Sequence, residues 1–437
     1  MLFRDDYAGD FDPGFEWQQL SRQALGRLGR EIMLCAMMHD RGLLPQVGQR
    51  FGPEAMTDIA VDEWMGSSPI YNERNRRLLG ITGDGVGSIL KGLQLDIGAP
   101  HQFLDFQFEL VDETRGYFWL PFCGAFSYVK EMARGSEKPI LQLCHHMEDT
   151  TFDATVGAVN PRARCIAEHR PPLSHDHEGP VCRWRVEISA EAHVEKERAI
   201  TAVVRDTGAA RFEHAAVRCE ADGGLEDYAG SFRADFALED LSQPVLARQC
   251  KEFALDFNLL VRAAYTSIQT HYGEAAMRDM ARTHWAAMAP SYTHRIRKAL
   301  GIEDIDMPAI LKTLQLDPCL APDYVKTGSE LVDSGCGRFW ICECDALQDV
   351  SPRPFLALLE GAEEPSALEA VACAVNPRAR VRRVDPSVCC GPGEEKRLAW
   401  EIVIEPDALP REEEPLSSLV RSNIFDFRFR PKAISAV

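Results

Sequence analysis

The sequence predicts an α+β protein made by tandem duplication of one domain, with helices first and an antiparallel sheet after them. The first observation is a repeat. The segment Ala-Val-Asn-Pro-Arg-Ala-Arg at 158–164 returns unchanged at 374–380, an offset of 216 residues. The second observation is the order of hydrophobic patterns, in which helical spacing precedes strand alternation. An identical seven-residue match within one chain is hard to obtain by chance, so we expect two related domains.

The match extends well beyond this heptapeptide. At an offset of 221 residues, Trp64 matches Trp285, and a five-residue deletion in the second copy then shifts the offset to 216. A looser match of Arg4 to Tyr7 with 233–236 indicates where each copy begins. The unit is domain-sized rather than a solenoid repeat. We therefore predict a first repeat at 1–192, a linker at 193–232, a second repeat at 233–408 and a charged tail at 409–437.

Each unit opens with helical patterns. Apolar residues fall three and four apart from Trp17 to Ile32, and again from Leu246 to Val261. A second helix is expected around Trp64, interrupted near Pro69 because proline lacks the N–H that a helix interior needs. A third, short helix is expected at 89–95.

Strand patterns follow the helices. Alternation predicts strands at 106–110, 117–123 and 182–188, the last with Cys182, Trp184 and Val186 on one face. A helix is expected at about 150–159, ending before the Asn160-Pro161 pair. Two such domains are expected to pack about a pseudo-twofold axis, and the chain also allows a homo-oligomer.

Composition excludes several classes of function. The formal net charge is −19, which opposes nonspecific binding to DNA or RNA and to anionic membrane surfaces. The chain lacks a run of about 18 apolar residues and opens without a signal-peptide pattern. We therefore expect a cytoplasmic protein with no nucleic-acid or membrane partner. Its fourteen cysteines are then core residues, metal ligands or reactive thiols rather than disulfides.

The two copies differ most in their cysteines and histidines. The first copy carries Cys123, Cys144, Cys165 and Cys182 with His145, His146 and His169. The second keeps only Cys344, at the position of Cys123, whereas Glu360, Val381, Asp385 and Leu398 replace Cys144, Cys165, His169 and Cys182. Thiolate and imidazole are natural ligands of zinc and of iron–sulfur clusters. We predict a zinc or iron–sulfur site at Cys123, Cys144 and Cys182, with Cys165 or His169 as the fourth ligand. The alternative is that these cysteines are small core residues.

A resemblance to a known family rests on the same residues. Phe122-Cys123, Leu143-Cys144, Asn160 to Cys165, Arg170-Pro-Pro172 and Cys182-Arg-Trp184 resemble bacterial proteins similar to L-2-amino-thiazoline-4-carboxylic acid hydrolase. The resemblance covers residues 100–190, with a degenerate second copy at 320–405. That family has a cysteine close to its Pro-Pro pair, where this chain offers Cys165 and His169. The resemblance implies a hydrolase, although a fold alone does not fix function.

Other residues suggest further roles. His145 or His146 is the expected acid–base residue, and Arg162 and Arg164 are either structural or a clamp for a substrate carboxylate. Cys144 beside His145 also fits a metal-free thiol nucleophile. In the second copy Cys342, Cys344, Cys389 and Cys390 suggest a second metal site or incidental thiols.

The function that we predict is a metal-dependent hydrolase or lyase acting on a small polar, carboxylated molecule in the first repeat. One alternative is a non-catalytic protein with a structural or sensory metal site, because four protein ligands leave zinc no open position. The other is a metal-free cysteine hydrolase that uses Cys144.

Overall fold

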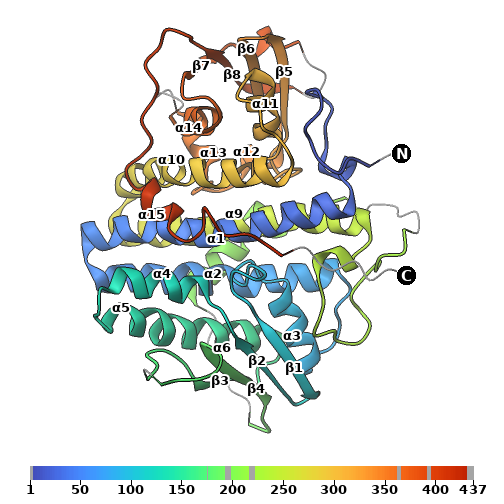
Figure 1. Ribbon diagram of the computed structural model, residues 1–437, viewed down its shortest axis with the longest axis vertical. Coiled ribbons are helices and arrows are strands. Elements are labelled where there is room, and N and C mark those ends of the chain that lie inside the picture. The colour runs from blue at the N-terminus through green and yellow to red at the C-terminus, as the bar shows by residue number, and fades with distance from the viewer. Residues whose placement is uncertain are drawn as a thin grey trace.

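The computed structural model describes residues 3–174, 176–191, 198–215, 222–361, 366–390 and 395–430. It confirms an α+β fold in two similar halves, with two four-stranded antiparallel sheets that each follow helices. Four long helices form the middle of the molecule, and one sheet lies at each end of its long axis (Figure 1).

The first half contains three helices, a hairpin, a helical segment and a second pair of strands. These are α1 (Arg22–Phe51), α2 (Pro53–Leu78), α3 (Val86–Gln94), β1 (Gln107–Asp112), β2 (Arg115–Leu120), α4 (Gly124–Ala133), α5 (Lys138–Leu141), a π-helical turn (Gln142–Met147), α6 (Glu148–Val159), β3 (Ala163–His169) and β4 (Cys182–Ile188). The short helices α7 (Ala199–Arg205) and α8 (Gly208–Arg211) lead into the second half.

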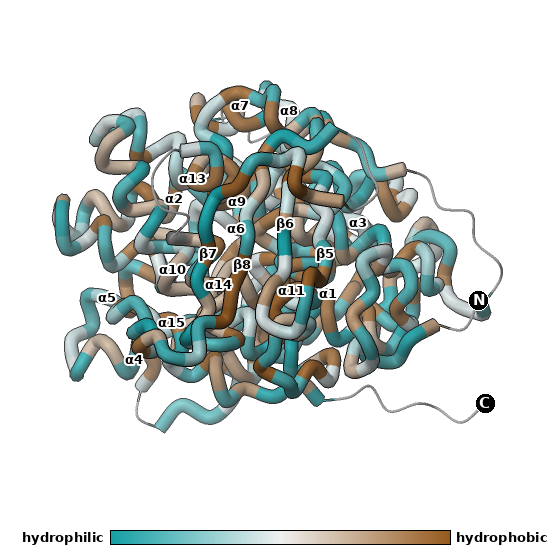
Figure 2. The backbone as a smooth tube through the Cα atoms, turned by 90° about the horizontal axis from the view of Figure 1, so that it is seen from above, coloured by the Kyte–Doolittle hydropathy of each residue, from teal (hydrophilic) through white to brown (hydrophobic). Residues whose placement is uncertain are grey.

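The second half repeats this order. Its elements are α9 (Gln243–Tyr272), α10 (Glu274–Ala299), α11 (Met307–Gln315), β5 (Thr327–Asp333), β6 (Cys336–Cys342), α12 (Asp345–Gln348), α13 (Leu356–Glu360), α14 (Ser366–Val375), β7 (Ala379–Val384), β8 (Lys396–Ile404) and α15 (Ser417–Arg421). The sheet orders are β1-β2-β4-β3 and β5-β6-β8-β7. Figure 2 looks down on the second sheet, with α14 and α11 beneath it.

The long helices begin and end where local chemistry requires it. The Ser21 hydroxyl accepts a hydrogen bond from the Ala24 N–H (3.2 Å) and caps the start of α1. Gly52 and Gly273, with φ of 99° and 88°, end α1 and α9 and begin α2 and α10. Such positive φ values are strained for any residue with a Cβ, so glycine sets both corners.

The two halves share one core. Helix α1 packs on α2, α9 and α10, and α2 packs on α9. Two buried ion pairs cross between the halves in equivalent places: Arg74 with Glu252 and Arg295 with Glu31, each through two bonds of 2.6 and 3.0 Å. This pairing agrees with the expected pseudo-twofold arrangement.

In each half, the segment before the first long helix, which we call its arm, crosses to the other half and contacts it. The Tyr7 N–H donates to the Leu300 carbonyl and the Tyr228 N–H donates to the Leu79 carbonyl, both at 2.7 Å. The Tyr7 hydroxyl lies 2.8 Å from the Gln315 side-chain oxygen, and the second copy repeats this contact between Tyr228 and Gln94 at 3.0 Å. The structural equivalence is therefore Tyr7 with Tyr228, at the offset of 221, and the looser match of Arg4–Tyr7 with 233–236 is wrong. The second arm lies inside the segment expected to be a linker.

Each half ends in an equivalent segment that packs against the core. Arg74 donates to the carbonyls of Ala210 and Phe212 (2.8 and 2.6 Å), and Arg295 donates to those of Ile424 and Phe427 (2.6 and 2.8 Å). We call residues 417–430 the tail segment. It runs back from the second half and lies along α1 (Figure 1).

Two local expectations are wrong. Helix α2 continues through Pro69, because the Met65 carbonyl that Pro69 leaves without a partner accepts the Thr201 hydroxyl at 2.9 Å. Strand β2 ends at Leu120, so Cys123 lies beyond the strand and its thiol accepts the Phe126 N–H (3.3 Å) at the start of α4. Cys144 lies in a π-helical turn.

Replacing Arg295 with methionine is expected to destabilise the protein by about 3–5 kcal/mol, because Glu31 stays buried without its partner. The double variant Arg295→Met/Glu31→Leu is expected to recover most of that loss, since it leaves no unpaired charge. Urea unfolding measures both. Equal losses in the single and the double variant would contradict the assignment of the cost to the stranded carboxylate.

Candidate functional site

The four cysteines predicted as ligands are buried in the lower half of Figure 1, on different elements. Cys123 precedes α4, Cys144 lies in the π-helical turn, Cys165 lies in β3 and Cys182 begins β4. Wide spacing in the sequence thus becomes proximity in the fold, because β2 and β4 are paired and bring Leu120 opposite Cys182.

The thiols influence one another electrostatically. The pKa of Cys123 is raised to about 12, mainly by burial and secondly by the Glu148 carboxyl. Burial also raises the pKa of Cys144 and of Cys182 well above the usual thiol range, with Glu148 and the neighbouring thiols adding to the effect. These cysteines are therefore neutral at pH 7 in the absence of a cation. They do not bring three sulfur atoms within 4.8 Å of one another.

The predicted histidines are engaged elsewhere. The His145 ring lies 2.8 Å from the Pro171 carbonyl, and the His169 ring lies 3.0 Å from the Pro180 carbonyl. Each ring uses its Nε2, which must donate because a carbonyl only accepts. His146 is exposed. His169 also packs beside His177, with ring centroids 5.1 Å apart.

The repeated heptapeptide is a structural element. The Asn160 side chain donates to the Asp84 carbonyl (3.0 Å), and its counterpart Asn376 donates to the Ile305 carbonyl (2.8 Å). Arg164 forms an ion pair with Asp153 (3.2 Å), and the Arg162 side chain is exposed. The Asp153 carboxylate also accepts the Cys165 N–H at 2.8 Å, and Glu369 repeats this bond with Val381 at 3.0 Å. Neither arginine lines the cavity described next.

A cavity of about 110 Å³ lies between α2, α3 and α6 of the first half. Its wall includes three carboxyl groups, of Asp40, Asp96 and Glu148, and the thiols of Cys123 and Cys182. Hydroxyl side chains and Trp64 complete the polar and aromatic part of the wall; the hydroxyls are those of Ser68, Tyr71, Thr151 and Thr155. This volume holds a few water molecules or a small organic molecule.

The second half has apolar side chains at several of the same positions. Ala289 replaces Ser68, Val371 replaces Thr155 and Leu398 replaces Cys182. Phe355 is fully buried against Trp285, with ring centroids 5.0 Å apart. Glu364, which corresponds to Glu148, lies outside the described residues. A polar cavity wall is thus a feature of the first half that the fold does not require.

One polar pair in the cavity wall, Tyr71 with Asp96, is present in both halves. The Tyr71 hydroxyl donates to Asp96 at 2.7 Å, and Tyr292 donates to Asp317 at 3.0 Å in the second half. Burial raises the pKa of both aspartates to about 6. Because this pair persists where the cavity wall is apolar, we assign it to the scaffold.

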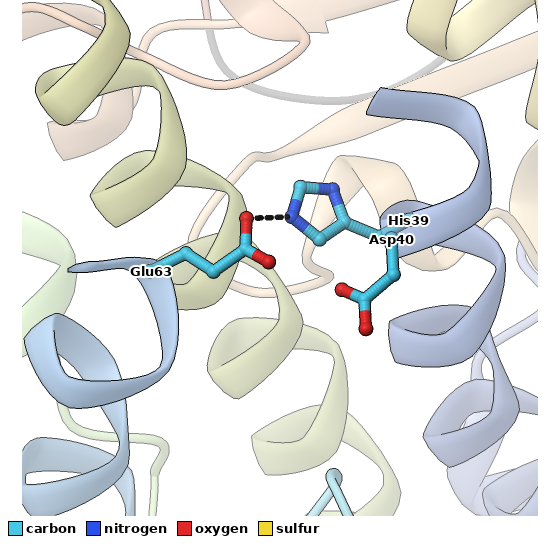
Figure 3. A group of neighbouring side chains, drawn as sticks. All are labelled: His39, Asp40 and Glu63. Carbon is cyan, nitrogen blue, oxygen red and sulfur yellow. Dashed lines mark hydrogen bonds and ion pairs between the residues drawn. The ribbon is translucent and has the colours of Figure 1, made fainter. Parts of the chain in front are cut away.

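A buried group beside the cavity was missed by the sequence reasoning. His39 and Asp40 of α1 and Glu63 of α2 bring one ligand atom each within 4.8 Å of one another, and they alone do so among the described His, Cys, Asp and Glu residues. The His39 Nε2 lies 3.1 Å from the Glu63 carboxylate. Figure 3 shows the carboxylates of Glu63 and Asp40 facing the space between their helices, with the His39 ring beside them. Asp40 also belongs to the cavity wall.

The group continues into the second half. The His39 Nδ1 lies 3.0 Å from the His284 Nε2, and the other nitrogen of His284 lies 2.9 Å from the Tyr265 hydroxyl. His284 stands at the position that Glu63 occupies in the first copy, at the offset of 221. All four central helices therefore contribute to one buried network: α1, α2, α9 and α10.

Burial dominates the electrostatics of this network. It lowers the pKa of His39 to about 4 and raises the pKa of Glu63 well above its usual range. Burial, and then the nearby Glu63, raises the pKa of Asp40 in the same way. The nearest cation acting on Asp40 is Arg41, but its guanidinium stacks on the Tyr128 ring at 4.2 Å. Arg41 therefore offsets the burial of the Asp40 carboxyl only in part, and no cation of the described residues lowers the pKa of Glu63.

The same comparison of copies could have found this group. At the offset of 221, Leu260 and Val261 stand for His39 and Asp40, and His284 stands for Glu63. Helical spacing predicts that these positions face the core. It does not predict which helices meet there.

The cysteines of the second half form no comparable site. Cys342 and Cys389 pack with Trp340 and Ala399 in a small apolar cluster, and Cys390 is exposed. Within the described residues, they do not assemble a group of three ligand atoms.

Comparisons with known proteins add no family assignment: no family model, no curated protein and no solved structure matches the chain. None of the helices within the described ranges is both long and apolar enough to cross a membrane.

Thiol labelling should separate the exposed cysteine from the cavity cysteines. A shift of the Cys123 pKa from 9.0 to about 12 lowers its thiolate fraction at pH 8 by roughly a thousandfold. We expect Cys390 to react with iodoacetamide within minutes, whereas Cys123, Cys144 and Cys182 stay unlabelled in the folded protein. Peptide mass spectrometry reads the sites. Fast labelling of Cys144 would instead support the metal-free thiol enzyme.

Proposed function

We propose that the protein is a metal-dependent hydrolase or lyase that acts on a small polar molecule bound in the cavity of the first half. The cation is held by His39, Asp40 and Glu63. The observation that carries this proposal is a buried pair of carboxyl groups: among the described residues no other side chain donates to Glu63 Oε1 or Asp40 Oδ1, so that only a proton shared between the two carboxyls or a cation can satisfy them. Buried polar atoms almost always have partners, and a bound cation would supply one to both.

The donor set favours a single ion over an iron–sulfur cluster. One imidazole and two carboxylates suit zinc and similar divalent ions, whereas clusters take thiolates. Three protein ligands leave a coordination position open, as catalytic zinc requires. Asp40 links the group to the cavity wall, so that position lies near a molecule in the cavity. An ion there would act as a Lewis acid or activate a water molecule.

Glu148 is the acid–base residue that the cavity offers. Burial raises its pKa to about 8, so the carboxyl holds a proton at pH 7 while it faces the cavity. A proton donor with a pKa near the working pH is suited to general acid catalysis. His145 and His146, predicted for this role, do not line the cavity.

The thiol site remains a second candidate for the metal. Its ligands would be Cys123, Cys144 and Cys182, with Cys165 or His169, and the supporting observation is that the second copy has lost all of these residues except Cys123. The site is closed by four protein ligands, which favours a structural or sensory role. The high pKa of Cys144 opposes the metal-free cysteine hydrolase.

Cobalt(II) added to the metal-free protein distinguishes the two sites. Thiolate ligands give intense charge-transfer absorption in the near ultraviolet, whereas nitrogen and oxygen ligands give only weak visible bands. We expect saturable binding with weak bands, and the same spectrum in Cys144→Ser. Intense near-ultraviolet bands that vanish in Cys144→Ser would place the ion at the thiols. The absence of saturable binding would overturn metal dependence itself.

A further inference from the structure

A second cavity, of about 280 Å³, lies nearer the start of α1 than the group in Figure 3. It is formed by the start of α1, the end of α10 and the tail segment. Six cationic side chains line it against two carboxylates. The cations are Arg27, Arg30, Arg295, Lys298, Arg428 and Arg430. Such a concentration of positive charge stands out in a chain with a net charge of −19.

The two carboxylates are already neutralised. Glu31 is paired with Arg295 (2.6 Å), and Glu239 with Arg30 (2.5 Å), in buried contacts. Lys298 is exposed and has no carboxylate partner in the part of the chain that the structure describes. Arg30 is 4% exposed, and its Nε has no hydrogen-bond acceptor among the described residues. The cavity therefore contains donors and charge that the protein itself does not satisfy.

At the equivalent positions of the other half, carboxylates of the chain itself pair with the cations. There, Asp323 binds Lys251 at 2.8 Å, and Glu213 lies 3.4 Å from Arg77. A third acid, Glu73, stands on the same helix as Arg77. Glu73 pairs with Arg205 at 2.9 Å, so all three carboxylates have a cationic partner within the chain.

The corresponding residues around the cavity are not acidic. Gln102, His294 and Arg428 stand where the other half has Asp323, Glu73 and Glu213. Ring contacts fix this register. Phe427 meets Phe103 edge-on at 5.1 Å, as Phe212 meets Tyr324 at 5.4 Å. Gln102 and Asp323 also share positive φ values of 65° and 73°. Three negative groups have thus been replaced by neutral or positive ones at one location.

His294 and Phe425 form the aromatic part of the wall, stacked with centroids 4.3 Å apart. The pKa of His294 is lowered by burial and then by Lys298, Arg297 and Arg295. Its ring is therefore neutral at pH 7 and able to donate a hydrogen bond without adding charge. The surrounding cations create the local positive potential that an anion would relieve.

We propose that this cavity binds a small molecule bearing a phosphate dianion or pyrophosphate group. Guanidinium and ammonium groups that converge on one space match phosphate oxygens. Arg428 and Arg430 have carboxylate partners outside the cavity, Asp426 at 3.9 Å and Asp105 at 3.5 Å, whereas Arg27 and Lys298 have none among the described residues. The site does not depend on the proposed enzymatic reaction.

Isothermal titration of the full-length protein with inorganic pyrophosphate tests the site, at an ionic strength held constant with sodium chloride. Lys298→Glu and His294→Glu are the informative variants. The second introduces the residue that the other half carries at that place, so the fold already accommodates it. The matched control is Arg77→Glu, which makes the same charge change at the position equivalent to Lys298.

Wild type and Arg77→Glu are expected to bind one pyrophosphate with the same affinity. Each variant in the cavity is expected to bind about tenfold more weakly or worse, since each loses a charge-assisted contact or gains a repulsive one. Citrate serves as a carboxylate probe. Unsaturable heats in wild type, equal losses in all three variants, or binding of citrate without pyrophosphate would each overturn the proposal.

Discussion

Replacing Glu63 with glutamine is expected to weaken cobalt or zinc binding by at least about 100-fold. Loss of a residue that only supports a ligand typically costs 10–100-fold, so removal of a direct ligand should cost no less. Glutamine keeps the shape of the side chain and can still accept the His39 hydrogen bond, so the fold should persist. Titration of the metal-free variant, followed by circular dichroism, measures both properties.

The matched control for Glu63→Gln is Asp96→Asn. Asp96 is also a buried carboxyl that lines the cavity, but its partner is the Tyr71 hydroxyl and the second copy retains the pair. We expect its metal affinity to stay close to that of wild type, because Asp96 is not one of the proposed ligands. Equal loss of affinity in both variants would show that any cavity carboxyl matters, and would contradict the assigned ligands.

The variant Glu148→Gln is expected to stabilise the protein at high pH by several kcal/mol. The folded-state pKa of Glu148 is about 8, against a model value of 4.5. The stability that its protonated form contributes is fully present below pH 4.5 and is lost as pH rises through 8. A shift of this size corresponds to roughly 4–5 kcal/mol at pH 9, as an upper limit, because each pKa unit is worth about 1.4 kcal/mol.

Glutamine removes that penalty because it cannot ionise. The difference between variant and wild type should be small at pH 5 and grow between pH 5 and 9, which urea unfolding at both values measures. Asp149→Asn is the matched control, since Asp149 is adjacent in sequence but half-exposed and paired with Arg170. Parallel pH profiles for wild type and Glu148→Gln would contradict a buried, neutral Glu148.

Patterns within one element were predicted well from the sequence. Alternation placed Cys182, Trp184 and Val186 on the buried face of β4, and apolar spacing identified the first helix of each half. These patterns are local because the side-chain period of a helix or strand follows from its own backbone. The repeat itself fixed the fold class, since a duplicated unit must fold the same way twice.

Contacts between elements could not be predicted from the periodicity of single elements. The helix through Pro69 survives because Thr201, distant in sequence, supplies the missing donor. The arms of Tyr7 and Tyr228 cross to the opposite half, a choice that periodicity does not encode. His39 and Glu63 meet His284 only because α1, α2 and α10 are neighbours in the bundle. The cysteines of the first half influence one another electrostatically, but no three of their sulfur atoms lie within 4.8 Å of one another.

The most direct test of the account is the metal content of protein purified without oxygen, for wild type, Glu63→Gln and the triple variant Cys123→Ser/Cys144→Ser/Cys182→Ser. Inductively coupled plasma mass spectrometry measures it. The account predicts about one equivalent of a divalent ion in wild type and in the triple cysteine variant, and a near-complete loss in Glu63→Gln. Less than about half an equivalent in wild type, or an ion lost with the cysteines and retained in Glu63→Gln, would contradict it.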